Sequence, residues 1–420
     1  MKVIIVASKL GYQTQAFAEA ALRLGLEPVL ATDRCGSLND PWRDHAFPLK
    51  FHRPAESAAR LARLVPEAAG ITAVGDKPAL AAAHIARRLG LPFHPPKAVE
   101  AAGNKYLARQ AFRKAGLPVP AYFRVPLLSE PARACSRASF PCVLKPLGLS
   151  GSRGVIRANS PAEFLAAFGR IRRLLDSPEI LRGRDPSLGY IQVEDYVPGR
   201  EFALEGLVSG GILRTLAIFD KPDPLEGPFF EESIYLTPSR EPVAAQAAMS
   251  EAIQRAVTAL GLTHGPVHAE LRVNEQGPWV LEVAARPIGG LCARVLRFHG
   301  GASLEEVILK HALQPDDAAP ALELSAAGVM MIPIPCDGIY ENCFGAGAAR
   351  ATPGIETIEI TARHGQVYKR LPEGGSYLGF IFARGAHTPE VEASLRRAHA
   401  HLDFRFAATL PVFPPLVPKP

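Results

Sequence analysis

Apolar runs and helix-like stretches alternate over the first 98 residues of the chain. The expected elements are strands at 3–7, 28–32 and 71–74 and helices at 14–24 and 78–89. Strands that alternate with helices are typical of a parallel sheet covered by helices. Residues 1–98 are therefore predicted to form a small parallel-sheet domain, which ends at the Pro-rich segment 91–96.

The middle of the chain changes from helix-like to strand-like patterning. A helix is expected over 98–115, and Ser160, Pro161 and Glu163 predict a capping box at the start of another helix. The further expected elements are strands at 142–146, 155–157, 190–197 and 199–206, a helix at 243–260 that Gly261 ends, and a hairpin over 267–286.

A second linker is expected at 314–320, where Pro, Asp and Ala dominate. Strand-like sequence over 327–383 and a helix at 389–402 then predict a final α+β domain. The whole chain is predicted to be α/β and α+β, with domains at 1–98, 99–315 and 316–420 and a lid subdomain at about 120–197.

Two glutamates occupy the strands of the expected hairpin. If residues 274–278 form its loop, Val273 faces Trp279, and Glu270 lies directly across from Glu282 on the same face. Two carboxylates about 5 Å apart repel each other unless a cation lies between them. All-oxygen ligation of this kind suits magnesium that bridges phosphate groups. The sequence therefore indicates a metal site, with a solvent-facing charged hairpin as the alternative.

A glycine-rich loop follows the strand at 142–146. Its glycines allow backbone amides to approach an anion, and its serines add hydroxyl donors. These residues are Gly148, Ser150, Gly151, Ser152 and Gly154. The loop joins two strands, so it fits neither a P-loop nor a dinucleotide fingerprint, and a flexible hairpin is the alternative. Lys145 on the preceding strand can neutralise bound phosphate, which favours a phosphate-binding loop.

The composition is typical of a soluble globular protein, with 48% hydrophobic and 21% charged residues. The apolar run at 3–7 is too short to span a bilayer and lacks a signal-peptide cleavage site, so a cytoplasmic protein without a membrane partner is expected. The net charge of +6 is spread along the chain, and no nucleic-acid partner is expected. Six cysteines without a CxxC pair indicate neither a zinc site nor a disulfide framework.

Taken in chain order, these candidates and a few neighbours resemble the ATP-grasp superfamily across residues 1 to about 310. The positions are Asn104, Lys105, Lys145, the glycine loop, Glu194, Val197, Gly199, Glu201, Glu270 and Glu282. The segments 229–239, 282–290, 328–335 and 371–382 are similar to the L-amino acid ligases, the last two to their C-terminal domain. The resemblance implies an ATP-grasp fold with a Rossmann-like domain before it and an L-amino acid ligase-like domain after it.

The resemblance also implies how ATP is bound. Lys105 and Lys145 would contact the phosphates together with the glycine loop. Glu194 and the backbone of Val197 would read the adenine at the hinge between subdomains, and Glu201 would hold the ribose hydroxyls.

Metal and substrate sites follow from the same resemblance. Glu270 and Glu282 would bind Mg²⁺, with Mn²⁺ as the alternative, and Arg286 would act with Lys145 as a catalytic residue. The substrate-binding residues would be Glu232, Arg286, Gly289 and Gly290.

Two departures from the family pattern leave details open. Many ATP-grasp enzymes carry Asn two residues after the second metal glutamate, where this chain has Ala284. The bacilysin-type ligase carries His three residues after its substrate glutamate, where this chain has Tyr235. His264 and His268, near the hairpin, are expected to be structural.

The implied activity is an ADP-forming ligation of a small carboxylate, such as an amino acid, to a small amine through an acyl phosphate. Arg286 and Lys145 would spread the developing charge, and the glycine loop would close as a lid against water. An ATP-grasp carboxylase or purine-pathway ligase is the alternative enzyme, and a non-catalytic nucleotide-binding protein is a third reading. The sequence leaves open whether the protein forms a homodimer.

Overall fold

The computed structural model describes residues 1–8, 11–33, 46–314 and 320–408, so Cys35 and most of the expected linker at 314–320 lie outside it. The N-terminal part is a parallel sheet with strand order β3-β2-β1-β4. Its elements are β1 Lys2–Ala7, α1 Tyr12–Arg23, β2 Glu27–Thr32, β3 Ala46–Pro48, α2 Pro54–Leu64, β4 Ala68–Val74 and α3 Asp76–Leu89. The predicted parallel sheet is confirmed, although α2 was not among the expected helices.

The helix expected over 98–115 is wrong, because two helices occupy this segment. α4 Pro96–Ala102 ends at Gly103, and α5 Lys105–Lys114 begins after Asn104. The Asn104 side chain accepts hydrogen bonds from the backbone N–H groups of Tyr106 and Leu107 at 3.1 and 3.2 Å. This N-cap satisfies free donors of α5 and starts the helix at Lys105.

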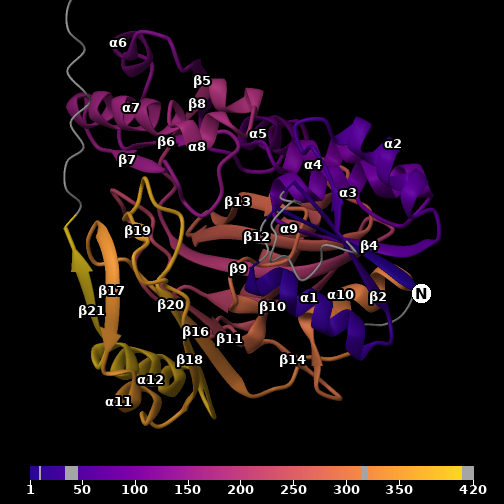
Figure 1. Ribbon diagram of the computed structural model, residues 1–420. Helices are drawn as coiled ribbons and strands as arrows, with labels where there is room; N and C mark the ends of the chain where they lie inside the picture. Colours follow the sequence, from indigo (N-terminus) through magenta and orange to yellow (C-terminus); the bar gives the residue numbers. More distant parts are fainter. Residues whose placement is uncertain (9–10, 34–45, 315–319, 409–420) are drawn as a thin grey trace, which may run out of the picture.

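The segment predicted to be a lid subdomain, called the lid below, folds as a small antiparallel sheet with one long helix at the upper left in Figure 1. Its strand order is β5-β8-β6-β7. The elements are β5 Tyr122–Pro126, α6 Pro131–Cys135, β6 Cys142–Pro146, β7 Ile156–Ala158, α7 Pro161–Leu175, α8 Pro178–Leu181 and β8 Tyr190–Asp195. The predicted capping box is only half correct, since Ser160 accepts from Glu163 N while the Glu163 carboxylate accepts from Asn159 N. The glycine loop connects β6 to the antiparallel β7, as predicted.

An eight-stranded antiparallel sheet runs through the rest of the molecule in the order β13-β12-β9-β10-β11-β16-β20-β18. Its strands are β9 Arg200–Ser209, β10 Ile212–Asp220, β11 Ile234–Thr237, β12 Gly265–Asn274, β13 Gly277–Ala284, β16 Ala326–Ile332, β18 Ile355–Ile360 and β20 Gly379–Gly385. The pairing of β11 with β16 carries this sheet across the predicted boundary at 315/316. The domain limits therefore remain predictions, and the ATP-grasp and C-terminal parts share one sheet.

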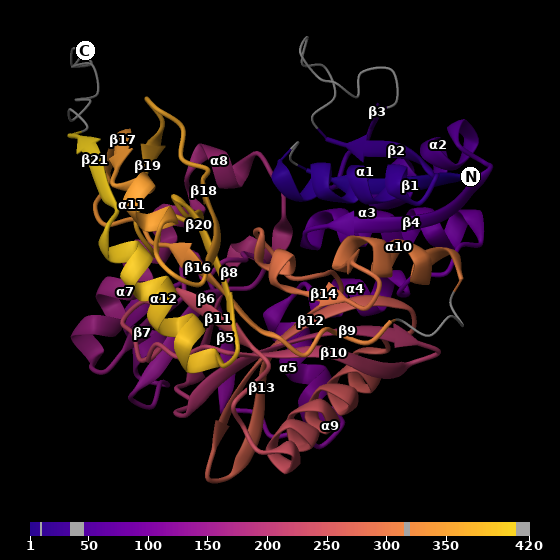
Figure 2. The ribbon, with the colours of Figure 1, turned by 90° about the horizontal axis from the view of Figure 1, so that it is seen from below.

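Helices cover this sheet and a smaller sheet flanks it (Figure 2). The covering helices are α9 Val243–Leu260, α10 Leu304–Leu313 and α12 Thr388–Ala400, with the short α11 Ala346–Arg350 beside α12. The flanking sheet holds β17 Gly338–Phe344, β19 Val367–Tyr368 and β21 Asp403–Ala407, and β14 Arg297–Phe298 pairs with β15 Ala302–Ser303. Among the described residues, no helix is long and apolar enough to cross a membrane.

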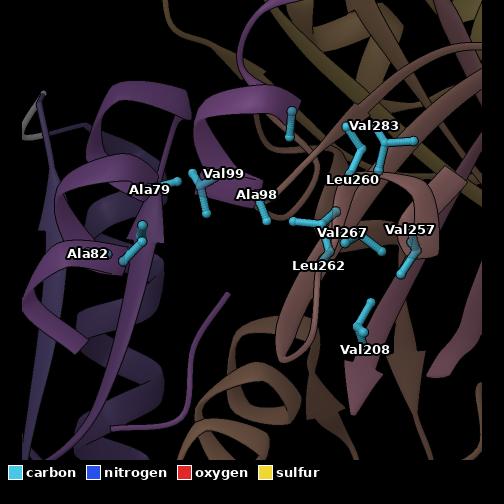
Figure 3. Packing of buried hydrophobic residues seen from close by; sticks show 14 of the residues in the cluster. Ala79, Ala82, Ala98, Val99, Val208, Val257, Leu260, Leu262, Val267 and Val283 are labelled. Atoms are coloured by element: carbon cyan, nitrogen blue, oxygen red, sulfur yellow. The ribbon is translucent and has the colours of Figure 1, made fainter. Parts of the chain in front are cut away.

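One apolar core joins the N-terminal sheet to the large sheet. Figure 3 shows Ala82 of α3 and Val99 of α4 in the same packed cluster as Leu260 of α9 and Val267 of β12. All four side chains are buried. Burying the two parts in one core fixes their relative position, and thereby the walls of the space between them.

Candidate active site

A cavity of about 430 Å³ is lined by residues of the N-terminal sheet, the lid, the large sheet and the C-terminal segment 375–377. Most residues predicted from the sequence line it. They are Lys105, Lys145, Ser150, Gly151, Ser152, Glu194, Val197, Glu201, Glu232, Glu270, Glu282, Arg286, Gly289 and Gly290. Gly148 and Gly154 lie outside the lining, where a side chain would collide with Ser187 and Pro146 respectively. These two glycines shape the loop rather than face the cavity.

The hairpin of β12 and β13 has the predicted pairing of the two glutamates but a different register. Glu270 lies across from Glu282, as predicted, whereas the expected pair of Val273 with Trp279 is wrong, because Val273 pairs with Pro278. The loop is the two-residue turn 275–276, which Gly277 permits with its φ of 98°. A bulge at Leu281 then absorbs the extra residue and brings the two glutamates level.

A ladder of charged side chains crosses one face of β9 and β12. Glu201 pairs with Arg272, Ala203 with Glu270, and Glu205 with His268. Arg272 donates to Glu201 Oε2 at 2.9 Å and to the carbonyl of Val197 at 2.8 Å, so it fixes the hinge that follows the lid. His268 was expected to be structural, yet it lines the cavity with Nε2 3.7 Å from Glu270 Oε1.

Lys221 lies among three carboxylates that were predicted to have separate roles. Its Nζ is 2.9 Å from Glu201 Oε1 and 3.7 Å from Glu270 Oε1, and it also donates to Glu232. Burial alone would lower the pKa of Lys221, but these carboxylates raise it well above its usual value. Burial and the neighbouring Glu270 raise the pKa of Glu232. Lys221 is thus a buried cation behind the three glutamates that line the cavity.

The lid supplies a second buried ion cluster around Glu194. Arg109 donates to both carboxylate oxygens at 3.0 and 3.2 Å, Lys145 binds Oε1, and Gln192 donates to Oε2 at 2.9 Å. Burial lowers the pKa of Lys145 to about 8 against the opposing effect of Glu194. Burial disfavours the ionised form of Glu194, yet Arg109 and Lys145 lower its pKa to about 2. The same Arg109 donates to the carbonyl of Leu281 at 3.0 Å and so holds the bulge of the hairpin of β12 and β13.

The remaining cations connect the parts of the cavity. Lys105 Nζ is 3.3 Å from Glu282 Oε2 and donates to the carbonyl of Leu149 in the glycine loop at 2.8 Å. Arg286 donates through Nε to Asp76 Oδ1 at 2.9 Å and through Nη1 to the carbonyl of Pro287 at 3.0 Å. Asp76 begins α3, so the N-terminal domain orients the arginine of the large sheet.

The donors at the hairpin suit a hard divalent cation. Glu270 and Glu282 are cross-strand neighbours, both line the cavity, and about a quarter of each side chain is exposed. Carboxylate oxygens that keep access to a phosphate-sized space are the ligands that Mg²⁺ takes alongside nucleotide phosphates. The carboxylates of Glu201, Glu232 and Glu270 also lie within 4.8 Å of one another, but the Lys221 ammonium already lies among them and offsets part of their charge.

Sequence reasoning missed several residues of the site. Lys221, Arg272, Glu205, Arg109 and Asp76 all act through partners that are distant in the sequence. One signal was present, because His268, Glu270 and Arg272 alternate along β12, which places three polar side chains on one face of a buried strand.

The comparisons with known proteins agree with this arrangement. Residues 138–295 match the model of the ATP-grasp domain, and residues 330–407 match that of L-amino acid ligase C-terminal domain 2. The structure superposes on the L-amino acid ligase from Bacillus licheniformis with a TM-score of 0.81 at 24% identity, over 97% of this chain and 98% of that one. That likeness shows a shared fold.

Two further proteins are similar to this chain in sequence. The uncharacterised protein y4rH of Sinorhizobium fredii is 23% identical over 416 residues, 96% of this chain and 83% of that one. The alanine–anticapsin ligase of Bacillus subtilis (strain 168) is 27% identical over 254 residues, 57% of this chain and 53% of that one, so the match spans about half of that ligase. With both family models matched in chain order, this chain combines an ATP-grasp domain with an L-amino acid ligase C-terminal domain 2.

Proposed function

We propose that this ligase joins the carboxylate of an amino acid to a small amine, with cleavage of ATP to ADP and phosphate, and so forms a dipeptide or an amino-acid amide. One observation carries the proposal. Lys145, the paired Glu270 and Glu282, and Arg286 line a single cavity in a chain that is similar to amino-acid ligases. A cavity that gathers cations around an acidic pair suits phosphoryl transfer.

The nucleotide would lie between the lid and the large sheet. Its phosphates would bind Lys105, Lys145 and the backbone of residues 150–152, and Glu194, Val197 and Glu201 would contact the nucleoside. Glu270 and Glu282 would hold Mg²⁺, with Mn²⁺ as the alternative; the ion would neutralise phosphate charge and polarise the γ-phosphoryl group. Because Lys145 also binds Glu194, ATP would share that lysine with the carboxylate.

Ligation then needs two steps. A carboxylate oxygen of the amino acid attacks the γ-phosphorus, which forms an acyl phosphate and releases ADP. The amine attacks the acyl carbon, loses its proton, and expels phosphate. Arg286 would stabilise first the transferring phosphoryl group and then the oxyanion of the tetrahedral intermediate, since its fork of donors reaches two oxygens at once.

The amino acid would be held by Glu232 near Gly289 and Gly290. Glu232 lines the cavity and would accept hydrogen bonds from the substrate ammonium group. Tyr235, three residues later on β11, is buried against Lys221, whose Nζ is 5.1 Å from the centre of its ring. The cytoplasmic location and the homodimer remain predictions.

Product analysis tests this function directly. Pools of amino acids and amines are incubated with the protein, ATP and Mg²⁺, ADP release is measured, and products are identified by mass spectrometry. The proposal expects ADP release that needs both a carboxylate and an amine, with one amide formed per ADP. ADP release that bicarbonate stimulates without any amine would instead indicate a carboxylase, and nucleotide binding without turnover in every pool would contradict a ligase.

A further inference from the structure

A fully buried glutamate lies behind the active-site lining. Glu205 is in the middle of β9 and has no exposed surface. Both of its carboxylate oxygens accept from the backbone N–H of Ile288, at 3.2 and 3.1 Å, and Oε2 is 3.1 Å from His268 Nδ1. A carboxylate is costly to bury, so its hydrogen bonds to Ile288 and His268 have to offset the lost hydration.

The first contact of Glu205 fixes the substrate segment. Ile288 lies midway between Arg286 and Gly290, the predicted catalytic and substrate-binding residues. While Glu205 accepts from its N–H, Gln13 of α1 donates to its carbonyl at 2.7 Å. The backbone of Ile288 is therefore held at its N–H by the large sheet and at its carbonyl by the N-terminal domain.

The second contact orients a histidine. Because Nδ1 of His268 faces Glu205, the opposite ring nitrogen points toward Glu270, whose Oε1 is 3.7 Å away. His268 is two residues from Glu270 on the same face of β12. Its ring therefore constrains where the Glu270 carboxylate can lie.

From these contacts we infer that Glu205 is a positioning residue with two outputs: it sets Glu270 for the metal through His268, and it sets the path from Arg286 to Gly290 through the peptide of Ile288. The inference rests on the proposed function for the roles of Glu270 and Arg286. Glu205 would touch neither substrate nor nucleotide, yet it would position both the metal-binding carboxylate and the substrate-binding segment. Such supporting carboxylates affect metal affinity or activity by about 10- to 100-fold when they are changed.

Three single variants separate the two outputs. H268Q removes the imidazole beside Glu270, Q13A removes the second holder of the Ile288 peptide, and E205Q affects both contacts. Two quantities are measured in each: the Mg²⁺ concentration at half-maximal ADP binding, by calorimetry, and the KM for the amino acid at saturating Mg²⁺. D220N is the matched control, since Asp220 is also a buried carboxylate, on the adjacent strand β10, and outside the cavity lining.

The expected pattern is specific. H268Q raises the Mg²⁺ requirement about 10-fold with little change in KM, Q13A raises KM with little change in the Mg²⁺ requirement, and E205Q raises both by about 10- to 100-fold. Adding H268Q to E205Q changes the Mg²⁺ requirement less than twofold further, whereas D220N changes neither quantity. Multiplicative effects in the double variant, or an unchanged Mg²⁺ requirement in H268Q, overturn the inference.

The test does not depend on E205Q alone. If that variant does not fold, the split between H268Q and Q13A decides the inference, and the reversed split overturns it. If the wild-type protein forms no amide from any substrate pool, the proposed function fails. The Mg²⁺ dependence of ADP binding then still decides whether Glu205 acts through His268.

Discussion

The floor of the cavity and its lid hold their functional groups in different ways. The floor, formed by β9, β12 and β13 with Lys221, uses side chains in buried ion pairs; the side chains of Lys221 and Glu201 are only 3% and 8% exposed. The glycine loop of the lid offers mainly backbone, and Gly151 and Ser152 there have φ angles of 64° and 54°. Under the proposed function, the groups that must stay fixed during charge transfer thus lie on a rigid sheet, while the group that must admit a nucleotide lies on a loop.

The lid is also bound by residues of the C-terminal domain, outside the floor. Gly154 N donates to the carbonyl of Pro372 at 2.9 Å, Arg153 Nε to the carbonyl of Glu373 at 3.0 Å, and Arg170 to both Glu373 carboxylate oxygens at 2.5 and 2.7 Å. We call these bonds the lid contact. The side chains of Arg170 and Glu373 are 39% and 29% exposed, so this contact lies partly in water, unlike the buried pair of Lys221 and Glu201 in the floor. Because such a partly exposed contact is weak, we expect the C-terminal domain to hold the loop closed reversibly.

The largest effect is expected where the floor carries the metal site. Glu282→Gln keeps the shape of the side chain but removes one carboxylate from the proposed Mg²⁺ site. We expect turnover to fall by at least about 10³-fold, the equivalent of about 4 kcal/mol of lost charge stabilisation. The fold should survive, because the ion pair that Glu282 forms within the described part of the chain is the partly exposed one with Lys105, worth at most about 1 kcal/mol. Turnover and the melting temperature without nucleotide check both halves, and near-normal turnover would remove Glu282 from the site.

Arg286→Lys tests whether the floor needs a shaped cation or only a positive charge. Lysine keeps the charge but replaces a planar fork of five donors with a compact ammonium group. We expect kcat to fall by at least about 100-fold, or about 2.7 kcal/mol, with a much smaller change in the Kd of ATP. Single-turnover rates of acyl phosphate formation and of amide formation are the measurement. If both rates are unchanged, Arg286 only anchors the end of the hairpin through Asp76.

Sequence reasoning was most successful where function depends on local order. The opposition of Glu270 and Glu282, the strand-to-strand glycine loop and the helix that Gly261 ends all follow from residues close in the chain. The hairpin register was wrong by one residue, because a two-residue turn and a bulge compensate each other and leave the same glutamates opposed. Alternation alone cannot separate these two solutions.

The missed residues share a physical cause. Arg109 meets Glu194, 85 positions away, and Arg286 meets Asp76, 210 positions away. Such pairs depend on how whole domains pack, which neither periodicity nor spacing encodes. The helix expected over 98–115 failed for a local reason, since Asn104 is a better N-cap than a mid-helix residue.

Acid should destabilise the region around β12 before it destabilises the lid. Residues 95–263, which include the lid, contain no histidine, whereas buried neutral histidines lie outside this range. His94 accepts from His264 N through Nδ1 at 3.2 Å and contacts the carbonyl of Pro266 through Nε2. Burial lowers its pKa to about 3. The unfolded chain binds this proton near pH 6.5 and the folded protein only near pH 3, so the free energy of unfolding is unaffected above pH 6.5 and falls below it.

For His94 alone the expected loss between pH 7 and pH 5 is about 2 kcal/mol. Urea unfolding at several pH values measures it. His94→Gln should flatten the dependence, whereas His52→Gln, at an exposed position, should leave it unchanged. Hydrogen exchange should show that β12 loses protection at pH 5 before the lid strand β6 does. Equal slopes in the wild type and His94→Gln would contradict the assignment.

The smallest effect should arise at the lid contact, and Glu373→Gln breaks its ion pair without changing its shape. Because that pair is partly exposed, it is worth at most about 1 kcal/mol, which corresponds to about a fivefold change in the fraction of open lid. An open lid admits water to the acyl phosphate, so ADP release per amide formed should rise severalfold, while the rate of acyl phosphate formation on the floor stays within about twofold.

Glu356→Gln is the matched control: Glu356 also binds arginines, Arg297 and Arg384, and is also 29% exposed, but it lies on β18 and away from the lid. If both variants keep the wild-type ratio of ADP to amide, the lid does not depend on the C-terminal domain, and the floor and the lid differ only in how they bind. If Glu373→Gln instead slows acyl phosphate formation as strongly as Arg286→Lys does, the contact belongs to the chemistry and the distinction between a fixed floor and an opening lid is lost.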